Sequence, residues 1–211
     1  MKNFDNSFLC DKVKLIAGTD EAGRGPLAGP VVAAAVVFSP ETFIDNVNDS
    51  KKLSEKEREE LFPIIIEKSL SYGVSIISNR KIDKINILQA SLLAMKKSVN
   101  KLQVKPDLIL IDGNKIFTHE IPTTAIVKGD SKSFCIAAAS IIAKVTRDKI
   151  MRRLSLKHPQ YLWSKNKGYP THEHINAIKL FGATSLHRQS FLHNILIEEF
   201  EIDFKHGEEL L

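Results

Sequence analysis

The chain has 211 residues, 43% hydrophobic and 26% charged, which is ordinary for one substantial globular domain. No apolar run approaches the roughly 18–20 residues that span a bilayer, and the N-terminus has no apolar signal segment, so we expect a cytoplasmic protein. Two cysteines exclude a disulfide framework or a cysteine-rich zinc site, while the net charge of +5 is only compatible with a polyanionic partner.

The first part of the chain predicts three strands and one helix. Runs of small and β-branched residues indicate strands at residues 14–19, 31–38 and 71–78. Ser54 and Glu57 have the spacing of a capping box, which predicts a helix from there through Leu61. Pro63 is expected to end or kink that helix.

The second part alternates between helix and strand. Residues 87–102 have apolar side chains at helical spacing, and short apolar runs predict strands at 108–111 and 123–127. A long alanine-rich helix is predicted over residues 133–156. Shorter helices are expected from Thr171 to Phe181 and over residues 191–200. This order predicts an α/β fold with a mixed central sheet flanked by helices and a small helical region at the C-terminal end.

Acidic residues follow three of the predicted strands. Asp20 and Glu21 end the first strand, Asp112 ends the strand at 108–111, and Asp130 follows the strand at 123–127. Ligand sites gather at strand ends in α/β sheets, so the four carboxylates converge if these strands are neighbours. Bare carboxylates would repel one another. A purely oxygen donor set of this kind suits Mg²⁺ or Mn²⁺ rather than zinc.

Each of two acidic residues also has a purely structural interpretation. Asp112 precedes Gly113 and could belong to a hairpin turn, and Asp130 could be the N-cap of the long helix. Asp20 and Glu21 are harder to explain structurally, because neither residue type favours a strand or a core.

The glycines after the first strand have a second interpretation. The segment GRGPLAGP, residues 23–30, matches a degenerate dinucleotide-binding fingerprint. That fingerprint requires a helix whose N-terminus meets the pyrophosphate, whereas here two prolines intervene and a strand is predicted next. The preceding Asp20 and Glu21 would also repel a pyrophosphate unless a metal ion intervened. A nucleotide-binding oxidoreductase is therefore the less favoured interpretation.

Several segments resemble motifs of the type 2 ribonuclease H family, also called the ribonuclease HII family. In chain order they are GTDEAGRGPLAGPVVAAAV, DSKKLS, INILQASLLAM, LILIDGN, KGDSKSFCIAAASIIAKVTRD, NKGYPTHEH and HRQSF. They span most of the chain. The resemblance implies a ribonuclease H-like fold, formed as a single catalytic domain over residues 1–211 with a C-terminal helical segment from about 160–211. It also implies a monomer.

The resemblance also implies an activity and a catalytic site. Such an enzyme cleaves the RNA strand of RNA–DNA hybrids and incises on the 5′ side of ribonucleotides embedded in duplex DNA, leaving 5′-phosphate and 3′-hydroxyl ends. By motif match, the catalytic and metal-binding residues are Asp20, Glu21, Asp112 and Asp130. Two Mn²⁺ or Mg²⁺ ions held by these carboxylates could activate water and stabilise the leaving oxygen.

The same match implies how the substrate is recognised. Gly23, Arg24 and Gly25 fall on the motif that contacts the ribose 2′-hydroxyl, and glycine allows the close approach that this contact needs. Tyr169 falls on the tyrosine that stacks at the RNA–DNA junction. Without the match, Tyr169 would be interpreted as a loop aromatic packed on the core.

Basic residues supply further candidates. Lys51 and Lys52 precede a predicted helix and are expected to bind phosphate, although a solvated charge pair is an equal alternative. Weaker candidates for phosphate contacts are Lys144, Arg147 and Arg188. Trp163 is interpreted as packing, and no histidine receives a role. A basic nucleic-acid-binding module whose carboxylates are only structural remains the non-enzymatic alternative.

Overall fold

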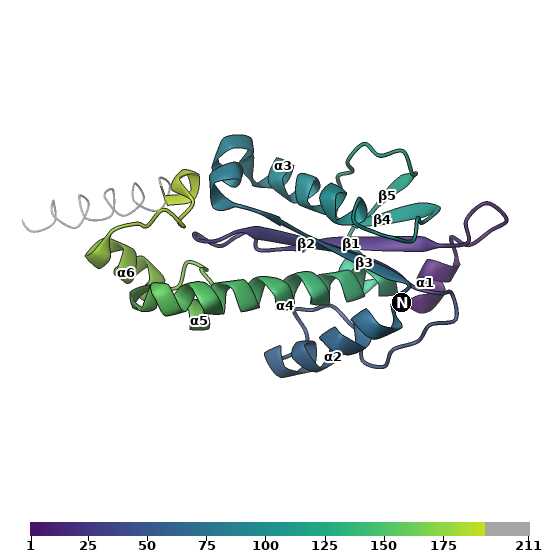
Figure 1. The fold of residues 1–211 in the computed structure, drawn as a ribbon, viewed down its shortest axis with the longest axis horizontal. Coiled ribbons are helices and arrows are strands. Elements are labelled where there is room, and N and C mark those ends of the chain that lie inside the picture. Colours follow the sequence, from purple (N-terminus) through teal and green to yellow (C-terminus); the bar gives the residue numbers. More distant parts are fainter. Residues whose placement is uncertain (193–211) are drawn as a thin grey trace, which may run out of the picture.

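The computed structural model describes residues 1–192 and contains one five-stranded mixed sheet (Figure 1). The strands are β1 (Ile16–Ala22), β2 (Val31–Val37), β3 (Ser71–Ile77), β4 (Leu108–Asp112) and β5 (Thr123–Ile126). Their order across the sheet is β3-β2-β1-β4-β5. The first three strands pair antiparallel, whereas β4 runs parallel to β1 and β5 parallel to β4.

Helices cover both faces of this sheet. α3 (Asn79–Val99) lies on one face, and α4 (Phe134–Lys157) lies on the other with α2 (Glu55–Lys68) packed beside it (Figure 1). β2 is buried on both of its faces, which explains why its sequence is continuously apolar. Its odd-numbered residues join the core under α3, and Ala34 and Val36 join the core under α4. The predicted fold class, a ribonuclease H-like mixed sheet flanked by helices, is confirmed.

The helix signals in the sequence are partly confirmed. The capping box is formed, because Ser54 Oγ accepts from the Glu57 N–H and Glu57 accepts from the Ser54 N–H. Pro63 does not end the helix, which continues to Lys68. Burial of Leu61 and Ile65 against α4 outweighs the hydrogen bond that the proline removes.

The helix predicted over residues 87–102 begins earlier than expected. α3 starts at Asn79, where the Ser78 hydroxyl accepts from the Lys81 N–H and caps it. Asn86 interrupts it with a φ of 63°, so the apolar periodicity is regular only after that position. This kink at Asn86 explains why the apolar spacing did not predict the first turns of α3.

The C-terminal part of the described chain is helical. It comprises the short segments η2 (Pro159–Tyr161) and α5 (Trp163–Asn166), followed by α6 (His172–Phe181), which Thr171 caps as expected. Trp163 is fully buried here, next to Met151 of α4 and Leu27. Most of the helix expected over residues 191–200 lies outside the described residues. The N-terminal α1 (Lys2–Asn6) packs beside α4.

In residues 1–192, no helix is both long and apolar enough to cross a membrane.

Candidate active site

Three parallel strands end at the same edge of the sheet, and each brings an acidic residue there. The β1–β4 register pairs Thr19 with Ile111, so that Asp20 and Asp112 are the next residues on neighbouring strands. β5 ends at Ile126, and the chain reaches Asp130 four residues later in η1 (Gly129–Ser131). The carboxylates that the sequence places after separate strands are therefore brought together by parallel pairing.

Asp20 and Glu21 lie where β1 extends beyond the end of β4. β1 remains paired with β2 through Ala22, so the local distortion that adjacent carboxylates would suggest is not needed. Glu21 instead reaches the site past the end of β4. Both side chains are largely buried, and both line one cavity of about 530 Å³. Other lining residues are Gly23, Arg24, Gly25, Ser50, Lys51, Arg58, Asp112, Ser140, Lys144 and Tyr169.

Asp112 and Asp130 are held against each other by the backbone. Asp112 Oδ1 accepts from the N–H of Gly129 at 2.7 Å and from the N–H of Asp130 at 3.3 Å. Neither residue has the structural role that the sequence left open. β4 and β5 are parallel, so Asp112 does not belong to a hairpin, and the N-cap of α4 is Ser133 rather than Asp130.

The cluster carries strong electrostatic repulsion. Burial, followed by the charges of Glu21 and Asp112, raises the pKa of Asp20 well above its ordinary value. Burial also raises the pKa of Glu21, although Arg24 at 3.4 Å opposes this. The pKa of Asp112 is raised by burial and by the neighbouring Asp130. Cations that join the cluster would relieve these penalties.

The donor set fits divalent ions that bring further ligands with them. All donors are carboxylate oxygens, which suit Mg²⁺ and Mn²⁺. Among residues 1–192, no three acidic, histidine or cysteine side chains are arranged to hold one ion by themselves. Mg²⁺ commonly takes one or two carboxylates and completes its shell with water and phosphate. A lysine ammonium already lies at this cluster, because Lys51 Nζ donates to Asp130 Oδ2 at 3.0 Å.

The Gly-Arg-Gly loop joins β1 to β2 and opens no helix, which excludes the cofactor-cradle geometry of a dinucleotide fold. The buried Arg188 side chain holds this loop through hydrogen bonds to its backbone. Its guanidinium donates to the carbonyls of Gly23 at 2.6 Å, Arg24 at 2.9 Å and Gly29 at 3.0 Å. The loop is therefore fixed through its carbonyl groups.

Arg147 supports the same loop from α4. It donates to the carbonyls of Pro30, Lys167 and Ala28 at 2.9–3.2 Å. Gly23 has a φ of 98°, and a Cβ there would collide with Arg147 Nε. Arg147 and Arg188 are both fully buried, so the expected phosphate contacts are wrong for both: they bind backbone carbonyls instead.

Tyr169 faces the cavity and is 40% exposed, so it is not packed into the core as the alternative interpretation required. A Cβ on Gly25 would lie 3.6 Å from Tyr169 Cε1, which places the bare glycine opposite the ring. The guanidinium of Arg147 lies 5.9 Å from the ring centroid. His174 Nδ1 lies 2.9 Å from the Tyr169 carbonyl and fixes the backbone behind the ring.

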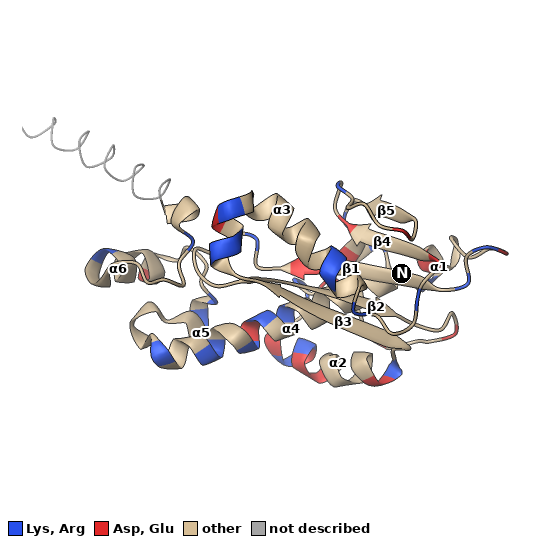
Figure 2. Ribbon diagram, turned by 45° about the horizontal axis from the view of Figure 1, so that its top comes forward, with Lys and Arg blue, Asp and Glu red and all other residues tan. Residues whose placement is uncertain are grey.

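Of the two lysines expected to bind phosphate, only Lys51 lines the cavity. Lys52 is exposed and lies outside the lining, as in the alternative of a solvated charge. Figure 2 shows acidic ribbon on β1, and on the C-terminal half of α4 the charged ribbon is mostly basic.

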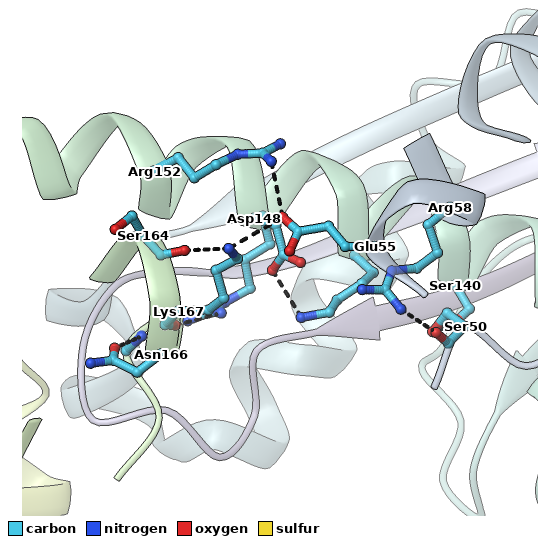
Figure 3. A network of polar contacts seen from close by, with 12 residues as sticks. Ser50, Glu55, Arg58, Ser140, Asp148, Arg152, Ser164, Asn166 and Lys167 are labelled. Carbon is cyan, nitrogen blue, oxygen red and sulfur yellow. Dashed lines mark hydrogen bonds and ion pairs between the residues drawn. The ribbon is translucent and has the colours of Figure 1, made fainter. Parts of the chain in front are cut away.

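Sequence reasoning missed the polar residues that surround the acids. Although burial raises the pKa of Asp20, the Ser140 hydroxyl acts to lower it. Ser140 Oγ also lies 2.8 Å from Ser50 Oγ, and Arg58 Nη1 donates to the Ser50 carbonyl at 2.7 Å (Figure 3). The signal for Ser140 was its place in α4, seven residues before Arg147 and buried among alanines. Nothing in the local sequence marks Arg58.

The comparisons with known proteins agree with this architecture. Residues 17–194 match the family model described as Ribonuclease HII. A ribonuclease HII from Clostridioides difficile is 56% identical over 195 residues, covering 92% of this chain and 74% of that protein. The ribonuclease H2 structure from Pyrococcus horikoshii has a TM-score of 0.73 at 29% identity, covering 88% of this chain and 97% of the other.

A further solved relative is the ribonuclease HII of Archaeoglobus fulgidus, whose structure is of a PCNA:RNase HII complex. It has a TM-score of 0.68 at 28% identity and covers 83% of this chain and 94% of that one. The family match over residues 17–194 and the relative that is 56% identical over 92% of this chain are decisive. The chain belongs to the ribonuclease HII family and is a ribonuclease H, an enzyme that cleaves the RNA of RNA–DNA hybrids.

Proposed function

We propose that this ribonuclease H also incises duplex DNA on the 5′ side of a single embedded ribonucleotide, using two Mg²⁺ or Mn²⁺ ions. One observation carries the proposal: Asp20, Glu21 and Asp112 line the same cavity as the Gly-Arg-Gly loop. Asp130 is not among the lining residues but lies next to them, because its N–H donates to Asp112 and its carboxylate accepts from Lys51, which lines the cavity. A metal-binding cluster and a surface open to ribose are thus only a few residues apart.

The acidic residues are proposed as the metal ligands. Asp20, Glu21, Asp112 and Asp130 would share two divalent ions with water and the scissile phosphate. When bound, such ions activate water and stabilise the departing 3′-oxygen. Burial of the carboxylates keeps their mutual repulsion high, so binding of cations is favoured over the bare cluster.

The Gly-Arg-Gly loop is proposed to detect the ribose. The carbonyls of Gly23 and Arg24 already accept from Arg188, so backbone N–H groups are left to donate to a 2′-hydroxyl. Gly25 leaves open the space beside the Tyr169 ring, where a sugar could approach closely. The half-exposed Arg24 guanidinium would meet an adjacent phosphate.

Tyr169 is proposed to pack against the sugar or base at the junction between RNA and DNA. Its ring is available for this because it faces the cavity while its backbone is fixed from behind by His174. A ring on a held backbone, opposite a glycine loop held by Arg188, would form a slot for the sugar.

The test is cleavage of duplex DNA that carries one ribonucleotide, with Mg²⁺ or Mn²⁺ and an all-DNA duplex as the blank. The wild-type chain should nick the duplex on the 5′ side of the ribonucleotide, leaving 3′-hydroxyl and 5′-phosphate ends. Asp130→Asn should abolish nicking but retain duplex binding, and Asp45→Asn, an exposed acid outside the cavity, should leave nicking unchanged. Cleavage of hybrids without nicking of the embedded ribonucleotide would refute the proposed substrate range.

A further inference from the structure

The loop between β2 and α2 is attached to the acidic site at two points. The hydroxyl of the buried Ser50 lies 2.8 Å from that of Ser140, which lines the same cavity as Asp20. The next residue, Lys51, reaches Asp130 with its ammonium at 3.0 Å. Arg58 donates to the Ser50 carbonyl and holds the loop from α2. The backbone that carries Lys51 is therefore fixed, and its position at the carboxylates follows from that attachment.

The Lys51 side chain itself can leave. It is 80% exposed, whereas the Asp130 side chain that it contacts is only 7% exposed. The pair thus has one buried partner of fixed position and one long, solvated partner. Ion pairs with an exposed partner are weak, so a competing cation can displace the lysine at little cost.

The charge balance gives Lys51 a reason to be there. Among residues 1–192, two ion pairs reach the four carboxylates: Arg24 with Glu21 at 3.4 Å and Lys51 with Asp130 at 3.0 Å. The positive charge of Lys51 also acts on Asp112 and Asp20. Its ammonium therefore holds one oxygen of Asp130, a carboxylate that a divalent cation at this cluster would use.

We propose that Lys51 is an internal counter-cation that competes with a divalent metal ion for Asp130 and is released towards the substrate phosphate when the metal binds. The inference rests on the metal site proposed above. It predicts that Lys51 weakens metal binding in the free protein. It also predicts that substrate strengthens metal binding, because a phosphate offers the displaced ammonium a new partner.

The experiment is a Mn²⁺ titration of the full chain, in which electron paramagnetic resonance measures the free ion. Lys51→Met should bind Mn²⁺ about two- to fivefold more tightly than wild type, as expected for removal of one exposed competitor. Lys52→Met is the matched control, because it removes the same charge from the next residue without removing the contact. Equal melting temperatures of the variants would show that the fold is unchanged.

A second titration includes an all-DNA duplex, which supplies phosphates without being cut. The duplex should raise the Mn²⁺ affinity of wild type more than that of Lys51→Met. Unchanged or weaker Mn²⁺ binding by Lys51→Met, or equal tightening by Lys52→Met, would overturn the inference. Asp130→Asn distinguishes failure of the proposed metal site from failure of the role of Lys51. If this variant leaves Mn²⁺ binding intact, the metal site itself is wrong and the inference falls with it. If it abolishes binding while Lys51→Met has no effect, only the inference fails.

Discussion

The acidic strand ends and the Gly-Arg-Gly loop are neighbours that handle buried charge in opposite ways. At the strand ends, Asp20 and Asp112 face other carboxylates, and burial makes their charged forms costly. At the loop, Arg188 and Arg147 are buried too, but each satisfies several backbone carbonyls. At the acidic strand ends the buried charges repel one another and lack sufficient cationic partners, so we call this the incomplete region. At the loop each buried arginine has several hydrogen-bond acceptors, so we call this the complete region. Binding of ions needs the first property, and recognition of a sugar by shape needs the second.

The largest effect should come from removing a charge of the incomplete region. Asp20→Asn should lower turnover by roughly a thousandfold or more, since several kcal/mol of charge stabilisation depend on the metal ligands. The same change should raise the melting temperature by a few degrees, because it removes a buried charge from a repulsive cluster. Kinetics and thermal melting together check this. A variant that is both inactive and less stable would contradict the view that the cluster is strained without cations.

The complete region should respond in the opposite way. Arg188→Met leaves the carbonyls of Gly23, Arg24 and Gly29 without their donor, which should cost about 3–5 kcal/mol of unfolding free energy. Denaturant unfolding measures the loss of stability. Arg153→Met is the control, because it makes the same substitution at an exposed arginine. If both variants were equally stable, the buried arginine would not be what holds the loop.

A finer change tests the loop alone. Gly23→Ala combines a strained positive φ with a collision against Arg147, whereas Gly182→Ala has a positive φ but nothing within 4 Å. Gly182→Ala should therefore cost about 1 kcal/mol and Gly23→Ala about 2–3 kcal/mol of stability. Only Gly23→Ala should also lower cleavage at an embedded ribonucleotide. Equal costs at the two glycines would show that the close approach of Arg147 is unimportant.

The smallest effect concerns the pH dependence of stability that comes from His187, which lies behind the His174 that contacts the Tyr169 backbone. Burial, then the neighbouring His174, lowers the pKa of His187 to about 4, and burial lowers the pKa of His174. Because the folded state favours neutral His187, its stabilisation is complete above an unfolded pKa near 6.5 and is lost as pH falls towards 4. From pH 7 to pH 5 this amounts to about 2 kcal/mol.

The carboxyl groups with raised pKa values stabilise the folded protein in the opposite direction as pH falls. The measurement is therefore the difference between wild type and His187→Gln, which removes the histidine's contribution alone. The stability difference should shrink by about 2 kcal/mol between pH 7 and pH 5. A difference that stays constant over this range would mean that His187 does not titrate as a buried neutral group.

These two regions also differ in how far sequence predicts them. Each carboxylate follows an apolar strand, so the local pattern identified the candidates. Their meeting depended on the parallel pairing of β1 with β4, which the sequence left as a condition. Arg147 and Arg188 could not be placed in this way. A basic residue in a helix or loop has the same local pattern whether it is exposed or buried, and Arg188 contacts Gly23 across 165 positions of the chain.

The same limit explains smaller misses. Pro63 was expected to interrupt α2, but burial of Leu61 and Ile65 depends on α4, which is far along the chain. Lys51 and Lys52 are adjacent and chemically identical, yet only Lys51 lies at the acids, because Ser50 is attached to Ser140. Local chemistry identifies candidate residues, whereas contacts between distant segments select among them.

The most direct test of the central claim is diffraction at the manganese absorption edge. The crystals would hold this chain, Mn²⁺ and a duplex with one ribonucleotide. We expect two anomalous peaks among Asp20, Glu21, Asp112 and Asp130, roughly 3.5–4 Å apart. The ribose 2′-hydroxyl should lie against the backbone of Gly23–Gly25. Manganese bound elsewhere, or a ribonucleotide positioned away from that loop, would contradict the account.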